Sequence, residues 1–179
     1  MLSIIKSYID IALLRAGPEV LPADRNLLLG TVLAFLALNI GLSLALRPDL
    51  QNLIPQHFVS VALLLIWYQI LLQLFGKPER FLQTATAIFG LGCIVAPVLV
   101  PAAAFVARFA ERPEEASPIV LMLLPLAFYV VFVTARILRA AIERPMFQCV
   151  LLVIAYTMVE AIVMVSMFGG GAPVTPATG

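Results

Sequence analysis

The amino-acid sequence predicts an all-α protein, a polytopic transmembrane bundle of about five helical spans preceded by an amphipathic interfacial helix. Of its 179 residues, 63% belong to the hydrophobic set and only 12% are charged, whereas soluble domains have about 45–50% apolar and about 25% charged residues. The mean hydropathy is +1.08. Several apolar stretches also reach the length of about 20 residues that a helix needs to cross about 30 Å of hydrocarbon.

Residues 1–17 predict an amphipathic helix that lies along the membrane surface. Ile5 and Ile9 fall on one side of such a helix, whereas Lys6 and Asp10 fall on the other. A Gly-Pro pair follows and would end the helix, because glycine accepts the left-handed cap conformation and proline cannot continue the hydrogen-bond ladder. The alternative is a cytoplasmic helix that packs on the protein itself.

Five apolar stretches are long enough to cross a membrane. We expect one transmembrane domain over residues 27–168, with spans at 27–46, 57–75, 81–107, 118–139 and 146–168. The third stretch contains Pro97 and Pro101, so it is either one kinked span or two shorter pieces. One span is favoured because two crossings need more residues than this stretch contains. The Gly, Pro and Thr composition of residues 169–179 predicts a flexible C-terminal tail.

The distribution of lysine and arginine predicts the orientation. If the N-terminus is cytoplasmic, the inner segments carry eight of the eleven basic residues and the outer segments carry three. Lysine and arginine beside a span are retained on the cytoplasmic side. We therefore expect a cytoplasmic N-terminus and a C-terminus on the outside.

Glu160 is an acidic residue inside the last predicted span. A carboxylate at this depth costs on the order of 3 kcal/mol if it is charged, so its side chain is expected to face the bundle. Asn39 lies at a similar depth in the first span, and Tyr156 and Thr157 are about one helical turn from Glu160. These residues, Glu160, Asn39, Tyr156 and Thr157, form a predicted intramembrane polar cluster. It is interpreted either as an ion or proton site or as a set of hydrogen bonds that fixes helix packing.

Arg136, Arg139 and Arg144 form a second predicted site, a basic patch at the inner end of the fourth span. Arginine side chains are long enough to extend from a helix to the membrane interface. Such a patch gathers anionic lipid head groups or, alternatively, docks an acidic partner.

The sequence carries no catalytic, cofactor-binding or metal-binding pattern. Two cysteines and one histidine do not complete a zinc site. There is no H-E-x-x-H, G-x-S-x-G or glycine-rich phosphate motif. The net charge of +1 excludes the strongly basic surface that binds nucleic acid. We therefore expect a protein that is not an enzyme and has neither a cofactor nor a nucleic-acid partner.

Two stretches carry a resemblance to a known family. The first, residues 76–87 (GKPERFLQTATA), is a short basic turn leading into the third span, and the second, residues 136–143 (RILRAAIE), precedes the last span. With the topology, they resemble the bacterial branch of the Yip family, five-span membrane proteins with a cytoplasmic N-terminal segment. The eukaryotic members engage lipidated GTPases, and the acidic and Tyr-Gly motifs expected before their first span are missing here. The resemblance implies a bacterial inner-membrane location and supplies no active-site residues.

The sequence as a whole predicts an integral membrane protein of structural or accessory type that binds another membrane protein or organises lipid. The alternative is a small transporter or channel that uses the carboxylate of Glu160. The expected partners are the lipid bilayer and either another membrane protein or further copies of the chain.

Overall fold

The computed structural model describes residues 2–46, 52–108 and 113–168, and every regular element in these ranges is helical. The elements are α1 (Leu2–Ala12), the 3-10 helix η1 (Pro18–Val20), α2 (Arg25–Leu46), α3 (Leu53–Leu74), the 3-10 helix η2 (Pro78–Arg80), α4 (Phe81–Arg108), α5 (Pro113–Ile142) and α6 (Met146–Phe168). The predicted all-α class is confirmed. The predicted tail at residues 169–179 lies outside the described residues.

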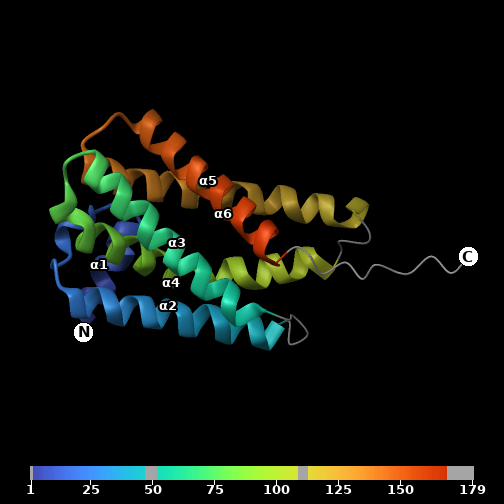
Figure 1. Cartoon of the computed structure of the whole chain (residues 1–179). Helices are drawn as coiled ribbons and strands as arrows, with labels where there is room; N and C mark the ends of the chain where they lie inside the picture. The colour runs from blue at the N-terminus through green and yellow to red at the C-terminus, as the bar shows by residue number, and fades with distance from the viewer. Residues whose placement is uncertain (1, 47–51, 109–112, 169–179) are drawn as a thin grey trace, which may run out of the picture.

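Helices α2 to α6 are long and apolar enough to cross a membrane. They run alternately up and down the bundle, so that the start of α2, the α3–α4 turn and the α5–α6 turn lie at one end (Figure 1). Each helix exposes large apolar side chains, with exposed fractions of 57% for Leu33, 56% for Ile66, 55% for Val98, 65% for Phe128 and 68% for Ile162. Exposed apolar surface of this extent on every helix is unfavourable in water and suits a lipid solvent. The chain is therefore a multi-pass membrane protein by length and composition.

Helices α3 and α5 differ by three or more residues, at one end or both, from the predicted spans. Helix α3 begins at Leu53, four residues before the expected start, and includes Pro55 in its first turn, where the missing N–H breaks no helical bond. Helix α5 starts earlier and ends later than expected, at Pro113 and Ile142. Helix α4 is a single helix that contains Pro97 and Pro101, and not two shorter pieces.

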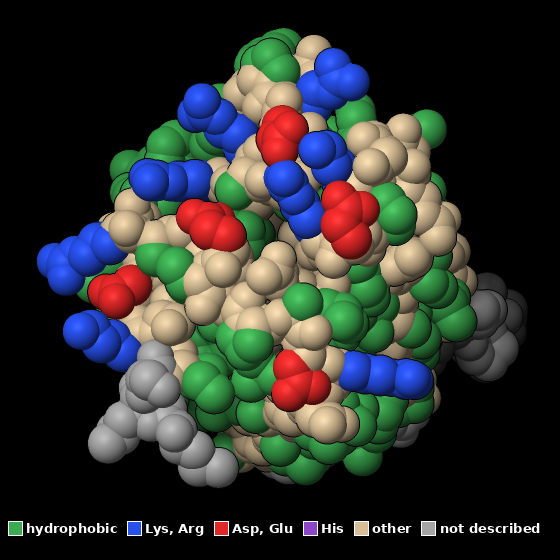
Figure 2. All heavy atoms as spheres, turned by 90° about the vertical axis from the view of Figure 1, so that its left-hand side faces the viewer, with side chains coloured by type: hydrophobic (Ala, Val, Ile, Leu, Met, Phe, Trp, Pro, Cys, Tyr) green, Lys and Arg blue, Asp and Glu red, His purple; other side chains and the backbone are tan. Residues whose placement is uncertain are grey.

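Charged side chains gather at the end of the bundle that carries the N-terminus (Figure 2). The eight lysines and arginines whose side chains the structure describes all belong to segments at this end, namely Lys6, Arg15, Arg25, Lys77, Arg80, Arg136, Arg139 and Arg144. We call this surface the charged end. Orientation relative to the two sides of the membrane stays a prediction.

Helix α1 packs on the protein itself. Its Tyr8 hydroxyl lies 2.7 Å from the Thr31 hydroxyl of α2, and the side chains of Ile11 and Ala12 are buried. The Tyr129 hydroxyl of α5 donates a hydrogen bond to the Ala12 carbonyl. Helix α1 therefore lies among α2, α4 and α5 as part of the bundle.

Helix α1 is shorter than the helix predicted over residues 1–17. Helix α1 ends at Ala12, and Leu14 adopts a left-handed conformation with φ of 62°. Ile5, Ile9 and Leu13 remain about half exposed along the outer side of this segment, at the i, i+4, i+8 spacing of one helix face. This apolar stripe is consistent with contact with the membrane surface, which stays a prediction.

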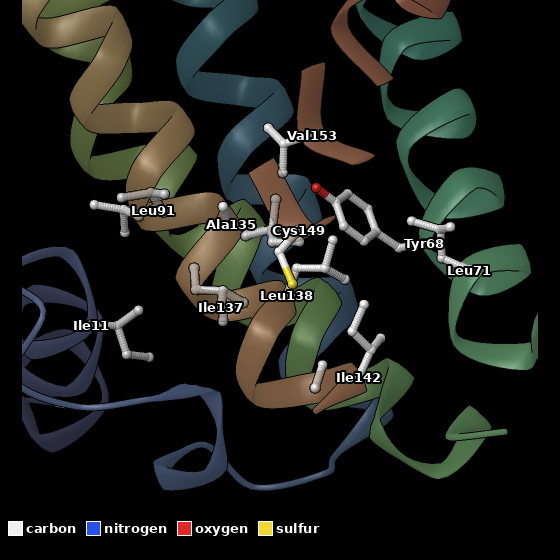
Figure 3. Packing of buried hydrophobic residues seen from close by; sticks show 14 of the residues in the cluster. Ile11, Tyr68, Leu71, Leu91, Ala135, Ile137, Leu138, Ile142, Cys149 and Val153 are labelled. Carbon is white, nitrogen blue, oxygen red and sulfur yellow. The ribbon is translucent and has the colours of Figure 1, made fainter. Parts of the chain in front are cut away.

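The core lies in the half of the bundle nearer the charged end. Tyr68 and Leu72 of α3, Leu138 of α5 and Cys149 of α6 are each at most 1% exposed. Figure 3 shows the Tyr68 ring pointing from α3 toward Cys149 and Val153. This packing holds α3, α5 and α6 together beneath the two turns of the charged end.

Candidate functional site

The α5–α6 turn is held in place by one arginine of the α3–α4 turn. Helix α5 ends where Glu143 adopts a left-handed conformation, with φ of 56°. The Arg80 guanidinium donates to the carbonyls of Ala140 (2.9 Å) and Ala141 (3.1 Å). These are among the last carbonyls of α5, which lack helical partners. A cation at a helix C-terminus also interacts favourably with the helix dipole.

Glu143 pairs with two cations of the α3–α4 turn. Its carboxylate lies 2.6 Å from the Arg80 guanidinium and 3.3 Å from the Lys77 ammonium. Hydrogen bonds from Arg80 and then from Lys77 hold the pKa of the Glu143 carboxyl below its ordinary value. The negative charge of Glu143 is therefore engaged by side chains of the neighbouring α3–α4 turn.

The predicted basic patch lines one pocket. This pocket has a volume of about 910 Å³ and lies between the N-terminal segment and the α5–α6 region. Its charged lining contains the cations Arg136, Arg139 and Arg144 and the carboxylates Glu19 and Glu143. Its apolar lining contains Ile11, Leu14, Phe132, Val133, Ile137 and Met146. We call it the basic pocket. A pocket lined by both cationic and apolar side chains fits an amphiphilic anion.

The three arginines of the basic pocket are not neutralised by carboxylates. Among the residues that the structure describes, the ion pairs join Glu143 to Lys77 and Arg80. The Arg144 guanidinium lies over the Phe75 ring at 5.4 Å, a cation–π contact that leaves its charge in place. An anion entering the pocket therefore meets cations that no internal carboxylate has already engaged.

The wall opposite the arginines is fixed by two hydrogen bonds. Tyr129 of α5 bonds the Ala12 carbonyl, and the Gln83 amide of α4 donates to the Leu21 carbonyl at 2.8 Å. These bonds hold residues 12 to 21 against the bundle. The position of the pocket wall therefore depends on contacts with both α4 and α5.

The second predicted site is centred on Glu160, at the interface of α3 and α6. Ser60 of α3 donates a hydrogen bond to the Glu160 carboxylate. The Tyr156 hydroxyl is buried and makes no hydrogen bond of good geometry in the described residues, although Ser60 and Glu160 lie near it. The Tyr156 ring packs beside Trp67 and Tyr68, with centroid separations of 6.0 and 6.1 Å. The structure thus brings Glu160 and Tyr156 together and adds Ser60, which sequence analysis missed.

Asn39 and Thr157 make their hydrogen bonds within their own helices. The Asn39 amide donates to the Phe35 carbonyl at 2.8 Å, and its side chain is buried. The Thr157 hydroxyl donates to the Ile154 carbonyl at 2.8 Å and is exposed. These bonds account for both side chains without Glu160. No described hydrogen bond therefore links Asn39 or Thr157 to Glu160.

A serine–histidine contact lies near the opposite end of the bundle. The Ser43 hydroxyl is 3.2 Å from Nε2 of His57, and both residues line a pocket of about 300 Å³. Serine hydrolases orient such a histidine with a carboxylate. The hydrogen bonds described for His57 include none to a carboxylate. We read this contact as a link between α2 and α3.

No protein-family model matches the chain, and neither a curated protein nor a solved structure matches it. The resemblance to the Yip family stays a prediction.

Proposed function

We propose that the chain is an accessory membrane protein that organises anionic lipid at the membrane surface where its charged end lies. The observation that carries this proposal is the basic pocket, in which Arg136, Arg139 and Arg144 share one cavity of about 910 Å³ without carboxylate partners among the described residues. Each basic side chain near an anionic membrane surface contributes about 1 kcal/mol of attraction.

The position of the arginines along α5 supports lipid as the bound anion. Arg136 and Arg139 precede the end of α5 by six and three residues, which correspond to about 9 and about 5 Å along the axis. Phe132, one turn deeper than Arg136, is 46% exposed. Exposed apolar and cationic side chains therefore succeed one another along one helix, as a bilayer interface requires.

We further propose that the charged end faces the cytoplasm of a bacterial cell and that the chain resides in the inner membrane. The gathering of the described lysines and arginines at one end supports this orientation. A cytoplasmic membrane surface carries anionic lipid, which this end of the bundle would then meet. The resemblance to the bacterial Yip family is compatible with the same location.

The experiment is a comparison of lipid composition in polymer-bounded discs excised from the native membrane. The test variant is R136Q/R139Q/R144Q, and the matched control is K6Q/R15Q/R25Q, which removes the same charge from the same end outside the pocket. We expect wild type and control to be enriched in anionic lipid relative to the bulk membrane and the test variant to lose that enrichment. Equal enrichment in all three proteins, or none in the wild type, refutes the proposal.

A small transporter or channel is the second candidate function. The observation that favours it is the Ser60–Glu160 hydrogen bond beside a buried Tyr156 hydroxyl, because polar side chains at membrane depth mark ion and proton pathways. Reconstituted vesicles test this candidate. A proton or cation flux that disappears in Glu160→Gln while the protein stays folded supports it, and absence of flux in the wild type rejects it.

A further inference from the structure

A second hollow along α5 and α6 shares a lining residue with the basic pocket. The second hollow has a volume of about 390 Å³ and is lined by Pro125, Phe128, Tyr129, Phe132 and Val150 among its apolar residues. Phe132 lines both hollows. We call the second hollow the apolar groove. Pocket and groove therefore adjoin at one side chain. We call the two together the track, which has a cationic end and an apolar end.

The length of this track matches one leaflet of a bilayer. Pro125 and Arg136 are eleven residues apart on α5, which corresponds to about 16 Å along the helix axis. Half of a hydrocarbon core of about 30 Å is about 15 Å. A molecule whose head group lies at Arg136 and whose chain follows the groove therefore spans the depth of one leaflet.

The cationic end suits a phosphate group. Arg136 and Arg139 are three residues apart, so they project from neighbouring positions on the same side of α5, and Arg144 lines the pocket from the following turn. Guanidinium groups bind phosphate oxygens through paired hydrogen bonds. Of the two carboxylates that line the pocket, Glu143 is paired with Arg80 and Lys77. Glu19 is folded back over Gly17, where an added Cβ would lie 2.2 Å from its Oε2 atom.

The lining of the apolar groove suits an acyl chain because it exposes few polar groups. The one hydroxyl in its lining, that of Tyr129, is already bonded to the Ala12 carbonyl of α1. Phe128 is 65% and Phe132 is 46% exposed, so apolar surface is open along the groove. An acyl chain covering these rings buries it.

We infer that the basic pocket and the apolar groove form one site for a single anionic phospholipid, with the phosphate at Arg136 and Arg139 and an acyl chain along Pro125, Phe128 and Phe132. This inference rests on the proposed function and goes further, because it replaces general enrichment of anionic lipid with one bound molecule per chain. The net negative charge of the head group supplies the charge recognition, because the quaternary ammonium of a zwitterionic lipid offsets its phosphate beside the arginines. The chain supplies the preference for lipid over a water-soluble phosphate.

The test is native mass spectrometry of the detergent-solubilised full chain with added phosphatidylglycerol, phosphatidylcholine or glycerol 3-phosphate. We expect one phosphatidylglycerol molecule to remain on each wild-type chain, with at least about tenfold weaker retention of phosphatidylcholine and of glycerol 3-phosphate. In R136Q/R139Q, we expect retention to weaken by about fivefold for each arginine removed. The charge-matched control K6Q/R15Q should keep the bound lipid. The charge-preserving variant R136K/R139K should retain it better than R136Q/R139Q but less well than wild type, because lysine keeps the charge without the paired donors of a guanidinium.

The groove has its own variant and control. Phe132→Ala shortens the side chain shared by the two hollows, and Phe147→Ala removes an exposed ring of α6 outside the groove lining. We expect Phe132→Ala to weaken retention of phosphatidylglycerol by about fivefold, which is the effect of losing roughly 40 Å² of apolar contact at roughly 25 cal/mol per Å². We expect Phe147→Ala to leave retention unchanged. Equal effects of the two substitutions overturn the assignment of the groove.

Three other outcomes overturn the inference. Glycerol 3-phosphate bound as tightly as phosphatidylglycerol shows a phosphate site without a chain. Equal retention of phosphatidylcholine shows that the arginines do not select the head group. A broad series of phosphatidylglycerol adducts with no saturable first molecule shows enrichment without a site, in which case this inference fails while the proposed function stands on the disc experiment.

Discussion

The Arg80 guanidinium lies 2.6 Å from the Glu143 carboxylate and also donates to the Ala140 and Ala141 carbonyls. One side chain of the α3–α4 turn thus holds the end of α5 and the turn that follows it. Arg144, the next residue, lines the basic pocket. The geometry of the pocket mouth therefore depends on a contact between residues more than sixty positions apart in the chain.

The first prediction concerns the pH dependence of stability. Because Arg80 and Lys77 hold the pKa of Glu143 below its ordinary value of 4.5, the contribution of this carboxylate to the free energy of unfolding is complete above pH 4.5. It is lost as the pH falls through the lowered native pKa. We expect wild type to exceed Glu143→Gln in unfolding midpoint above pH 4.5 and the difference to shrink at lower pH, as measured by thermal unfolding in detergent.

The effect at Glu143 is expected to be small, because exposed ion pairs are screened by water and salt. Glu79→Gln is the control, since Glu79 is an exposed carboxylate in the same turn without a described ion pair. A wild-type advantage over Glu143→Gln that grows as the pH falls would contradict the account.

The second prediction concerns the packing of α1 against α4. A Cβ added at Gly90 would lie 2.4 Å from Cδ1 of Tyr8, so Gly90→Ala forces the ring and α1 away from α4. We expect destabilisation by about 1–3 kcal/mol from overpacking and faster proteolysis of the N-terminal segment. Gly41→Ala is the control, because nothing lies within 4 Å of its added Cβ. Equal behaviour of the two variants would show that α1 does not need the close approach at Gly90.

The third prediction concerns the partner of Glu160. Ser60 donates to this carboxylate, so a double-mutant cycle of Ser60→Ala with Glu160→Gln is expected to show a coupling of about 0.6–1.7 kcal/mol in unfolding experiments. The corresponding cycle of Asn39→Ala with Glu160→Gln is expected to be additive, because Asn39 bonds the Phe35 carbonyl of its own helix. Coupling to Asn39 and not to Ser60 would restore the original sequence-based cluster.

The fourth prediction concerns orientation. With Cys93 and Cys149 replaced by alanine, single cysteines at Glu79 and at Asn52 mark the two ends of the bundle, and both positions are exposed. In intact spheroplasts we expect a membrane-impermeant maleimide to label Asn52→Cys at once and Glu79→Cys only after the membrane is opened. The reverse pattern would place the charged end outside.

The fold class could be predicted from composition and span length, because lipid as a solvent imposes both. The ends of α5 were missed, because the length criterion stops at the edge of the hydrocarbon whereas the helix continues beyond it. Pro113 at the first helical position followed by Glu114 and Glu115 is a favourable helix start. The local signals for this extension were therefore present in the sequence.

The candidate sites were predictable to different degrees. Arg136 and Arg139 share a face because they are three residues apart, so their association follows from the helix alone. The pairing of Ser60 with Glu160 depends on the rotation of α3 and α6 about their axes, and helices that are apolar on all sides carry no amphipathic pattern to fix that rotation. The apolar wall from Ile11 and Leu14 depends on long-range packing of the N-terminal segment.

The most direct test of the central claim is the thermal unfolding of the detergent-solubilised protein with added phosphatidylglycerol or phosphatidylcholine, since a ligand that binds the native state raises its unfolding midpoint. We predict that phosphatidylglycerol raises the midpoint of the wild type and of K6Q/R15Q/R25Q more than phosphatidylcholine does, and that R136Q/R139Q/R144Q loses this difference. Equal shifts with the two lipids in the wild type, or an undiminished difference in R136Q/R139Q/R144Q, would contradict the claim that the basic pocket binds anionic lipid.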